Sequence, residues 1–135
     1  DTGVTENTEV FDLDEEIVAR ARTLAGNNEQ RFATALEAES AVEGAHVVYA
    51  RSWQSIRDYG NPTLAASRRS RLSGWTIDEN LMQRSAEGRL MHAMPVRRNL
   101  EVSDEVLDGP RSLVYDQAEN RLHSQKALLV KLLRG

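Results

Sequence analysis

The chain is organised around the segment Arg89-Leu-Met-His-Ala-Met-Pro-Val-Arg-Arg-Asn99. Its apolar part, 90–94, predicts a short strand that stops at Pro95, because proline has no N–H with which to continue a ladder. Two guanidinium groups, Arg97 and Arg98, follow at once. Ligands of open parallel sheets bind beyond the carboxyl ends of the strands, so paired arginines at such an end predict an anion site. The alternative is a surface loop with two solvated charges.

The composition is that of an ordinary globular chain, with 135 residues, 40% hydrophobic and 28% charged residues, and a net charge of −4. This length suits one domain at most. A nucleic-acid scaffold is normally basic, so that class is disfavoured. The absence of cysteine excludes disulfides, thiolate metal sites and cysteine nucleophiles. No apolar run approaches the roughly 20 residues that cross a membrane, and the first residues have no secretory pattern, so we expect a cytoplasmic protein.

Helical and strand patterns alternate along the chain. Asp14 is a suitable cap for a helix that ends at Gly26 and should cover one face of a sheet. The stretch 52–74 has no sustained period, and we expect a loop there that is a candidate lid. The other expected elements are a weak strand at 30–34, an acidic helix at 36–42 closed by Gly44, a buried parallel strand at 46–50, a helix begun by a Thr76–Glu79 capping box, the strand at 90–94, a short helix from Ser103 to Gly109, a strand at 112–115, and a final helix capped by Asp116.

This alternation predicts an α/β fold, a three-layer αβα domain with a small parallel sheet and right-handed crossovers. The chain has no Gly-x-Gly-x-x-Gly turn, so a dinucleotide cofactor is not supported.

Three segments resemble the C-terminal third of the transcarbamylases, and the resemblance runs from about Phe11 to the end of the chain. The ornithine and N-acylornithine branches carry His-Cys-Leu-Pro in the first segment and Glu-Asn-Arg-Leu-His-x-Gln-Lys in the last. This chain departs from the first signature at Ala93 and Met94. The segments are His92-Ala-Met-Pro-Val-Arg-Arg-Asn99, Val102-Ser-Asp-Glu-Val-Leu-Asp-Gly-Pro110 and Asp116-Gln-Ala-Glu-Asn-Arg-Leu-His-Ser-Gln-Lys-Ala-Leu128.

The resemblance implies the Rossmann-like, amino-acid-binding domain of a two-domain carbamoyltransferase, without a cofactor or a metal. The first strand of that domain and the carbamoyl-phosphate-binding domain have no counterpart in residues 1–135. The implied partners are carbamoyl phosphate, an ornithine-like amino acid, the other domain and the further subunits of a homotrimer, but neither nucleic acid nor a membrane. The family also implies that the 52–74 loop passes through a neighbouring loop as a backbone knot, against the general prior for unknotted chains.

The resemblance assigns the carbamoyl side of the site to two elements. Arg121 matches the arginine that points at the carbamoyl oxygen, where a guanidinium strengthens its bond as negative charge develops. Its alternative is a surface arginine that pairs with Glu119 or Asn120. The backbone carbonyls of Ala93 and Met94 match those that accept the carbamoyl NH₂, a role that uses no side chain.

The amino-acid side of the site is assigned in the same way. Arg97 matches the residue that grips the substrate carboxylate in the acylornithine branch, whereas we expect Arg98 to be structural. Glu101 stands where some acylornithine enzymes carry lysine, which puts carboxylate affinity in doubt. His92 is a candidate catalytic residue, and its alternative is a structural histidine at a strand end.

The tract Tyr49-Ala-Arg-Ser-Trp-Gln-Ser55 bears on the choice of substrate. Ornithine-specific members have Asp at the position of Arg51, where it holds the α-ammonium of the substrate, and an arginine there would repel that ammonium. Acylation removes the ammonium charge, so the tract is similar to the N-acetyl- or N-succinylornithine branch, which has Lys-x-Trp here. Trp53 is a candidate pocket wall, with a core residue as the alternative.

Two other functions stay open. A noncatalytic amino-acid-binding or regulatory module of the same fold is suggested by the departures at Ala93 and Glu101. A structural interaction domain is suggested by the broad apolar face of the last helix. The basic residues Arg68, Arg69 and Arg71 lack interleaved aromatics, so a nucleic-acid patch is disfavoured.

Overall fold

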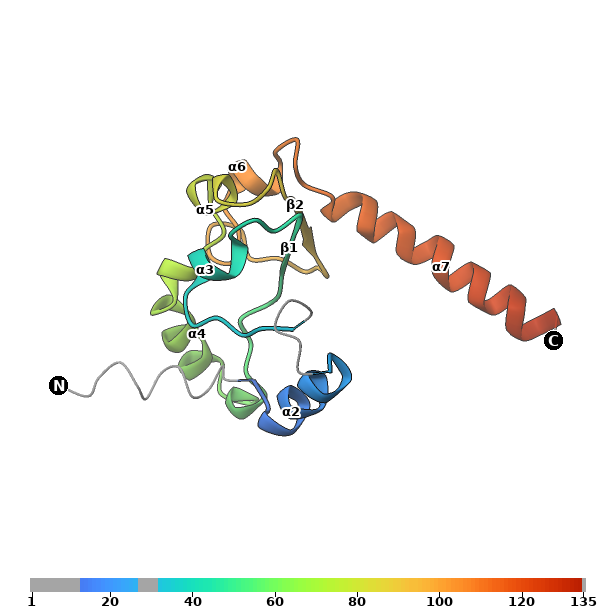
Figure 1. The fold of residues 1–135 in the computed structure, drawn as a ribbon, viewed down its shortest axis with the longest axis horizontal. Coiled ribbons are helices and arrows are strands. Elements are labelled where there is room, and N and C mark those ends of the chain that lie inside the picture. The colour runs from blue at the N-terminus through green and yellow to red at the C-terminus, as the bar shows by residue number, and fades with distance from the viewer. Residues whose placement is uncertain (1–12, 27–31, 135) are drawn as a thin grey trace. The chain divides into compact units, whose positions relative to one another are not determined.

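The computed structural model describes residues 13–26 and 32–134 (Figure 1). The chain divides into two compact units. Unit 1 combines Asp1–Ala41 with Trp53–Leu72, and unit 2 combines Val42–Ser52 with Ser73–Gly135. The elements in chain order are α2 (Glu15–Leu24), α3 (Ala38–Val42), β1 (Val47–Ala50), the 3₁₀ turn η1 (Ile56–Asp58), α4 (Pro62–Ser70), the 3₁₀ turn η2 (Ser73–Trp75), α5 (Glu79–Gln83), β2 (Arg89–His92), α6 (Asp104–Leu107) and α7 (Val114–Arg134).

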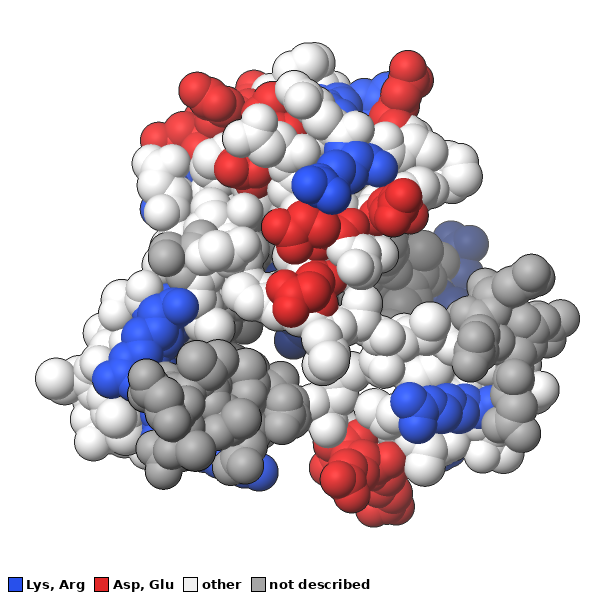
Figure 2. Space-filling view, turned by 60° about the vertical axis from the view of Figure 1, so that its left-hand side comes forward, with Lys and Arg blue, Asp and Glu red and all other residues white. Residues whose placement is uncertain are grey.

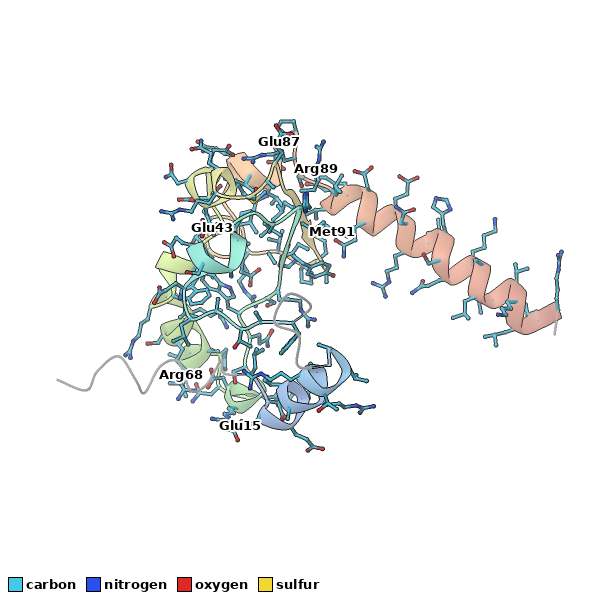
Figure 3. The ribbon with its side chains drawn as sticks, viewed as in Figure 1. Glu15, Glu43, Arg68, Glu87, Arg89 and Met91 are labelled. Carbon is cyan, nitrogen blue, oxygen red and sulfur yellow. The ribbon has the colours of Figure 1, made fainter. Side chains whose placement is uncertain are left out.

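The sheet of unit 2 joins β1 and β2 in parallel, which confirms the small parallel sheet of the predicted α/β fold. Ala50 faces His92 in the register, so both strands deliver their carboxyl ends to the same edge. An isolated parallel bridge from Leu90 to Ser112 continues the sheet by one residue. At the start of β2, Arg89 Nη1 donates to the Pro110 carbonyl at 3.0 Å (Figure 3, where Arg89 is labelled).

The apolar core of unit 2 is built from one face of the sheet and from the short helices. Val48 and Ala50 of β1 are buried, whereas Val47 and Tyr49 are about half exposed. The predicted parallel strand is confirmed, but its predicted burial holds for one face only, because side chains alternate along a strand. The remaining buried apolar residues of this unit are Val42, Leu81, Met82, Leu90, Val102, Val106, Leu107 and Val114.

The start of the helix predicted after Gly74 is displaced. Asp78 caps α5, with its Oδ1 accepting the Leu81 N–H at 2.8 Å. The predicted Thr76–Glu79 capping box is therefore wrong: Thr76 Oγ1 donates to the Leu100 carbonyl at 2.7 Å instead. Two cap-forming residues stand close together here, and the tertiary contact of Thr76 leaves the cap to Asp78.

The strand predicted over 112–115 is also wrong. Only Ser112 makes a bridge, and α7 begins at Val114, two residues before the predicted cap at Asp116. The Gln117 N–H already donates to the Leu113 carbonyl at 2.8 Å, so the helical ladder is established there. Asp116 lies in the first turn, where its charge complements the helix dipole. The short helix with Ser103 as its cap is confirmed as α6.

In unit 1 the predicted loop over 52–74 is wrong, because residues 62–70 form α4. Asn61 caps the helix and Pro62 occupies its first turn, which are strong local start signals despite the weak apolar period. Arg68 of α4 pairs with the buried carboxylate of Asp58. The candidate lid thus contains a helix of nine residues.

The helix predicted from Asp14 to Gly26 is confirmed as α2. Asp14 Oδ1 accepts the Glu16 N–H at 3.0 Å, and Gly26 turns the chain with a φ of +67°. No residue of α2 is buried, and Ile17 is 69% exposed. That this helix covers one face of a sheet stays a prediction.

Two weaker predictions in the neighbouring segment have mixed outcomes. Residues 30 and 31 lie outside the described ranges, and 32–34 form no strand. The helix predicted over 36–42 begins only at Ala38, and Gly44 has a φ of +68° as expected of its closing turn.

Candidate functional site

The candidate site lies beyond the carboxyl end of β2, the strand on which Figure 3 marks Arg89 and Met91. β2 ends at His92, two residues earlier than predicted, because the chain turns at Met94, whose φ is +46°. The Met94–Pro95 peptide bond is cis. The Met94 N–H donates to His92 Nδ1 at 3.0 Å. The ring of the buried His92 therefore closes this turn, while Ala93 and Met94 are exposed.

A buried carboxylate faces the other nitrogen of that ring. His92 Nε2 lies 3.4 Å from Glu101 Oε2, and the two side chains are only 2% and 0% exposed. Because Nδ1 accepts the Met94 N–H, the neutral ring carries its proton on Nε2, toward the carboxylate. Within the part of the chain that the structure describes, Nε2 makes no hydrogen bond of normal geometry.

Arg97 supplies the positive charge of this cluster. Its Nη1 donates to Glu101 Oε1 at 2.7 Å and to Ser52 Oγ at 2.8 Å. Its backbone N–H donates to Glu101 Oε2 at 2.9 Å. Ser52 stands two residues after β1, so the guanidinium connects the segments that leave both strands. Paired donors of this kind are what a buried carboxylate requires.

Arg98 has different partners. It donates to Asp104 Oδ1 at 2.7 Å and to Asp108 at 2.6 and 2.8 Å, and so ties the loop to α6. Hydrogen bonds from Arg98 hold the pKa of both carboxyls below the ordinary value, and the same bonds raise the pKa of Arg98. All three groups are exposed, so these pairs contribute little to stability.

α7 reaches the same strand ends through Gln117. Its Oε1 accepts the His92 backbone N–H at 3.1 Å, and its Nε2 donates to Tyr49 Oη at 2.8 Å. Our sequence reasoning missed this residue, because a glutamine in the first turns of a helix carries no signal of its own. Ser52 was missed for the same reason. The available hint was the position of Gln117 within the Asp116–Arg121 motif.

The structure places the remaining predicted site residues as follows. Arg121 lies one helical turn after Gln117, about 6 Å further along the same side of α7, and is exposed. Glu119, one of its predicted alternative partners, lies 3.6 Å from His123 Nε2. Arg51 is exposed directly after β1 and leaves the same sheet edge as Ala93. Trp53 is half-buried in unit 1, and its pocket role stays a prediction.

Metal sites and membrane-spanning helices each have structural requirements. Among residues 13–26 and 32–134, no group of three or more histidines and acids is arranged to hold a metal ion. On the face in Figure 2, acidic and basic side chains are interspersed. No helix in the described ranges combines the length and apolarity needed to cross a membrane.

Comparisons with known proteins bear directly on this geometry. Residues 3–132 match the family model for the Asp/Orn binding domain of aspartate/ornithine carbamoyltransferase. The chain is 43% identical over 122 residues to the ornithine carbamoyltransferase of Methanoculleus marisnigri, covering 90% of this chain and 37% of that protein. It is 36% identical over 127 residues to the ornithine carbamoyltransferase of Methanobrevibacter smithii, covering 93% and 41%.

Solved structures agree. A mutant N-acetyl-L-ornithine transcarbamylase complexed with carbamyl phosphate and N-succinyl-L-norvaline superposes with a TM-score of 0.74 at 34% identity, covering 90% of this chain and 36% of that one. The ornithine carbamoyltransferase from Pyrococcus furiosus gives a TM-score of 0.74 at 34% identity, covering 87% and 37%. The chain thus spans well under half the length of these relatives. Because the family model matches nearly all of it, this chain belongs to the aspartate/ornithine carbamoyltransferase family, within its Asp/Orn binding domain.

Proposed function

We propose that this chain is the amino-acid-binding part of a carbamoyltransferase that acts on the side-chain amine of an ornithine-like amino acid. The observation that supports this most is the convergence at one sheet edge of the His92–Met94 turn, Arg97 and the first turns of α7. In the proposed reaction the amine attacks the carbonyl carbon of carbamoyl phosphate, a C–N bond forms, and the C–O bond to phosphate breaks. Such a reaction needs orientation and charge stabilisation more than covalent help.

The carbamoyl group is proposed to lie between the turn after β2 and α7. Arg121 would donate to the carbamoyl oxygen, and the carbonyls of Ala93 and Met94 would accept from its NH₂. Within the described residues no backbone N–H donates to either carbonyl, which supports this use. The hydrogen bond from the His92 backbone N–H to Gln117 holds the first turns of α7 against the turn after β2. It therefore fixes the point on α7 from which the Arg121 side chain extends.

The amino acid is proposed to be an N-acylornithine. Arg51 stands at the sheet edge and is exposed, where it would repel a free α-ammonium but not an acylated nitrogen. Both side-chain bonds of Arg97 to Glu101 and Ser52 use Nη1. A guanidinium carries five N–H donors in a planar fork, so its other edge suits the substrate carboxylate.

We further propose that turnover needs a carbamoyl-phosphate-binding domain and takes place in a cytoplasmic trimer. The chain spans 37% of the Methanoculleus relative, which leaves room for such a domain in the whole enzyme. The absence of cysteine suits a reducing compartment.

Calorimetric titration of the chain with N-acetylornithine, N-succinylornithine, ornithine and aspartate tests the amino-acid site. We expect at least one acylornithine to bind about tenfold or more tightly than ornithine and aspartate. Binding that survives Arg97→Ala unchanged would contradict the site. The matched control is Arg111→Ala, which removes an arginine that pairs with Glu79 in the same unit.

Fusion of the chain to the upstream part of the Methanoculleus enzyme tests the reaction. We expect the fusion to form an acylcitrulline from carbamoyl phosphate, and the 135-residue chain alone to form none. Product formed by the chain alone would overturn the need for a second domain.

A noncatalytic binding or regulatory module is the second candidate, because Glu101 already neutralises Arg97 and because position 93 holds alanine. Tight amino-acid binding by a well-folded fusion that shows no turnover would favour this function.

A further inference from the structure

We propose that Glu101 is the positioning residue of this site, whose buried carboxylate fixes both the Arg97 guanidinium and the His92 ring at the end of β2. This inference rests on the proposed function for the identity of the ligand that Arg97 and His92 face. The coupling of Glu101 to Arg97 and His92 rests only on the contacts among these three side chains.

The two oxygens of Glu101 serve different groups. Oε1 accepts from Arg97 Nη1 at 2.7 Å, and Oε2 accepts from the Arg97 backbone N–H at 2.9 Å while facing His92 Nε2 at 3.4 Å. The Glu101 side chain is 0% exposed, so water does not compete for these oxygens. One carboxylate therefore fixes the direction of the Arg97 guanidinium and faces the Nε2–H edge of the His92 ring.

The backbone that carries Glu101 is held on both sides. Its carbonyl accepts the Ile77 N–H at 3.0 Å, and its N–H donates to the Arg97 carbonyl at 3.1 Å. The next residue, Val102, is fully buried and bridges both Ile77 and Arg98. The carboxylate thus starts from an anchored position, as a group that orients others must.

The influence of Glu101 extends to both strand ends. Through His92, whose Nδ1 accepts the Met94 N–H, it supports the turn after β2. Through Arg97, which donates to Ser52 Oγ, it supports the segment after β1. These contacts thus lead from Glu101 to Met94 through His92 and to Ser52 through Arg97.

These contacts require a carboxylate rather than an isosteric amide. Two Arg97 donors and the His92 Nε2–H face the two oxygens. An amide has one oxygen and an NH₂ group, so at least one of these donors would meet another donor. Glu101→Gln is therefore a small change in shape that removes a specific function.

Side-chain ¹⁵N NMR on the 135-residue chain tests the coupling without any ligand. In the wild type we expect separate, slowly exchanging resonances for the Arg97 guanidinium and imidazole shifts typical of the Nε2–H tautomer for His92. In Glu101→Gln we expect the Arg97 resonances to merge by faster rotation and the His92 Nε2 resonance to shift, while the Met94 N–H keeps the Nε2–H tautomer. Glu105→Gln, at an exposed acid of α6, is the control and should leave both signals unchanged.

The outcomes separate the coupling from the proposed function. A freely rotating Arg97 in the wild type, or signals of Arg97 and His92 that ignore Glu101→Gln, would overturn the inference. The wild-type measurement decides even if the variant fails to fold. In titrations we expect Glu101→Gln to weaken acylornithine binding about tenfold or more, and Glu101→Asp to recover part of it. NMR coupling with no amino-acid binding by the wild type would refute the proposed function and leave Glu101 as the group that fixes Arg97 and His92.

Discussion

Each of the two units holds a buried carboxylate paired with an arginine, and the two pairs are built differently. In unit 1, Asp58 of η1 pairs with Arg68 of α4, ten residues further along the chain. In unit 2, Glu101 pairs with Arg97 and also faces His92, and Arg97 reaches on to Ser52. The first pair connects a turn to the helix that follows it, whereas the second joins segments up to 45 residues apart in sequence.

This difference indicates which pair has a role beyond stability. A pair that joins a turn to the next helix is satisfied by local geometry. A pair whose arginine is 39% exposed at the shared end of two parallel strands keeps donors available there. The comparison therefore predicts that disrupting Arg97 affects ligand binding as well as folding, and that disrupting Asp58 affects folding alone.

The largest effect is expected from Arg97→Ala. It removes the proposed carboxylate contact and leaves the buried Glu101 with fewer donors, so we expect affinity for the acylornithine to fall by about 100-fold and unit 2 to lose about 1–3 kcal/mol. Calorimetric titration and urea unfolding measure the two effects. Unchanged affinity together with lost stability would show that the Arg97 pair, like the Arg68 pair, serves folding alone.

Asp58→Ala should destabilise without touching the site. Arg68 loses its buried partner but is itself 26% exposed and gains water, so we expect a loss of about 1–2 kcal/mol in the stability of unit 1. Urea unfolding checks this value, and the acylornithine titration should match the wild type. A tenfold loss of affinity would show that this pair also serves the ligand.

Gln117→Leu tests the contact between α7 and the ends of the two strands. It leaves the His92 N–H without its partner, while the half-exposed Tyr49 hydroxyl gains water, and we expect a cost of about 1–2 kcal/mol. If the link positions Arg121, turnover of the fusion should also fall. Tyr49→Phe removes only the second bond and is the control, with a cost of about 0.5–1 kcal/mol and near-normal turnover expected. Equal turnover in the two variants would contradict the idea that Gln117 positions Arg121.

The smallest effect concerns the exposed cluster of Arg98, Asp104 and Asp108. The pKa of each carboxyl is lower in the folded protein than its ordinary value, chiefly because of hydrogen bonds from Arg98. Stability from this source is therefore present above about pH 4, near the pKa of an unfolded Asp, and is lost as the pH falls through the lower folded values. Thermal unfolding from pH 7 to pH 2 should show a shallower acid decline in Arg98→Met than in the wild type. Parallel curves would assign these pairs no role.

The sequence predicts local features correctly where residues close together in the chain satisfy one another's backbone hydrogen bonds. Asp14 and Ser103 cap their helices because a short polar side chain reaches an N–H two or three residues on. Gly26 closes a helix because glycine tolerates a positive φ. The alternation of helical and strand patterns, which predicts the parallel sheet, and the family signature in 92–99 and 116–128 are also read directly from the sequence.

Other features depended on contacts between distant segments. Thr76 lost its capping role to a bond with Leu100, and Ser112 became a single bridge because the chain enters α7 directly afterwards. The partners of Glu101 also depend on tertiary structure, because no local sequence pattern predicts that its oxygens face His92 as well as Arg97.

The sequence was thus sufficient for the element types at well-capped positions, for the parallel α/β arrangement and for the arginines at a strand end. Folding alone decided which arginine is shared with a buried acid and which glutamine joins α7 to the sheet. The physical reason is that capping is a short-range hydrogen bond, whereas a buried carboxylate takes whatever donors the tertiary packing brings to it.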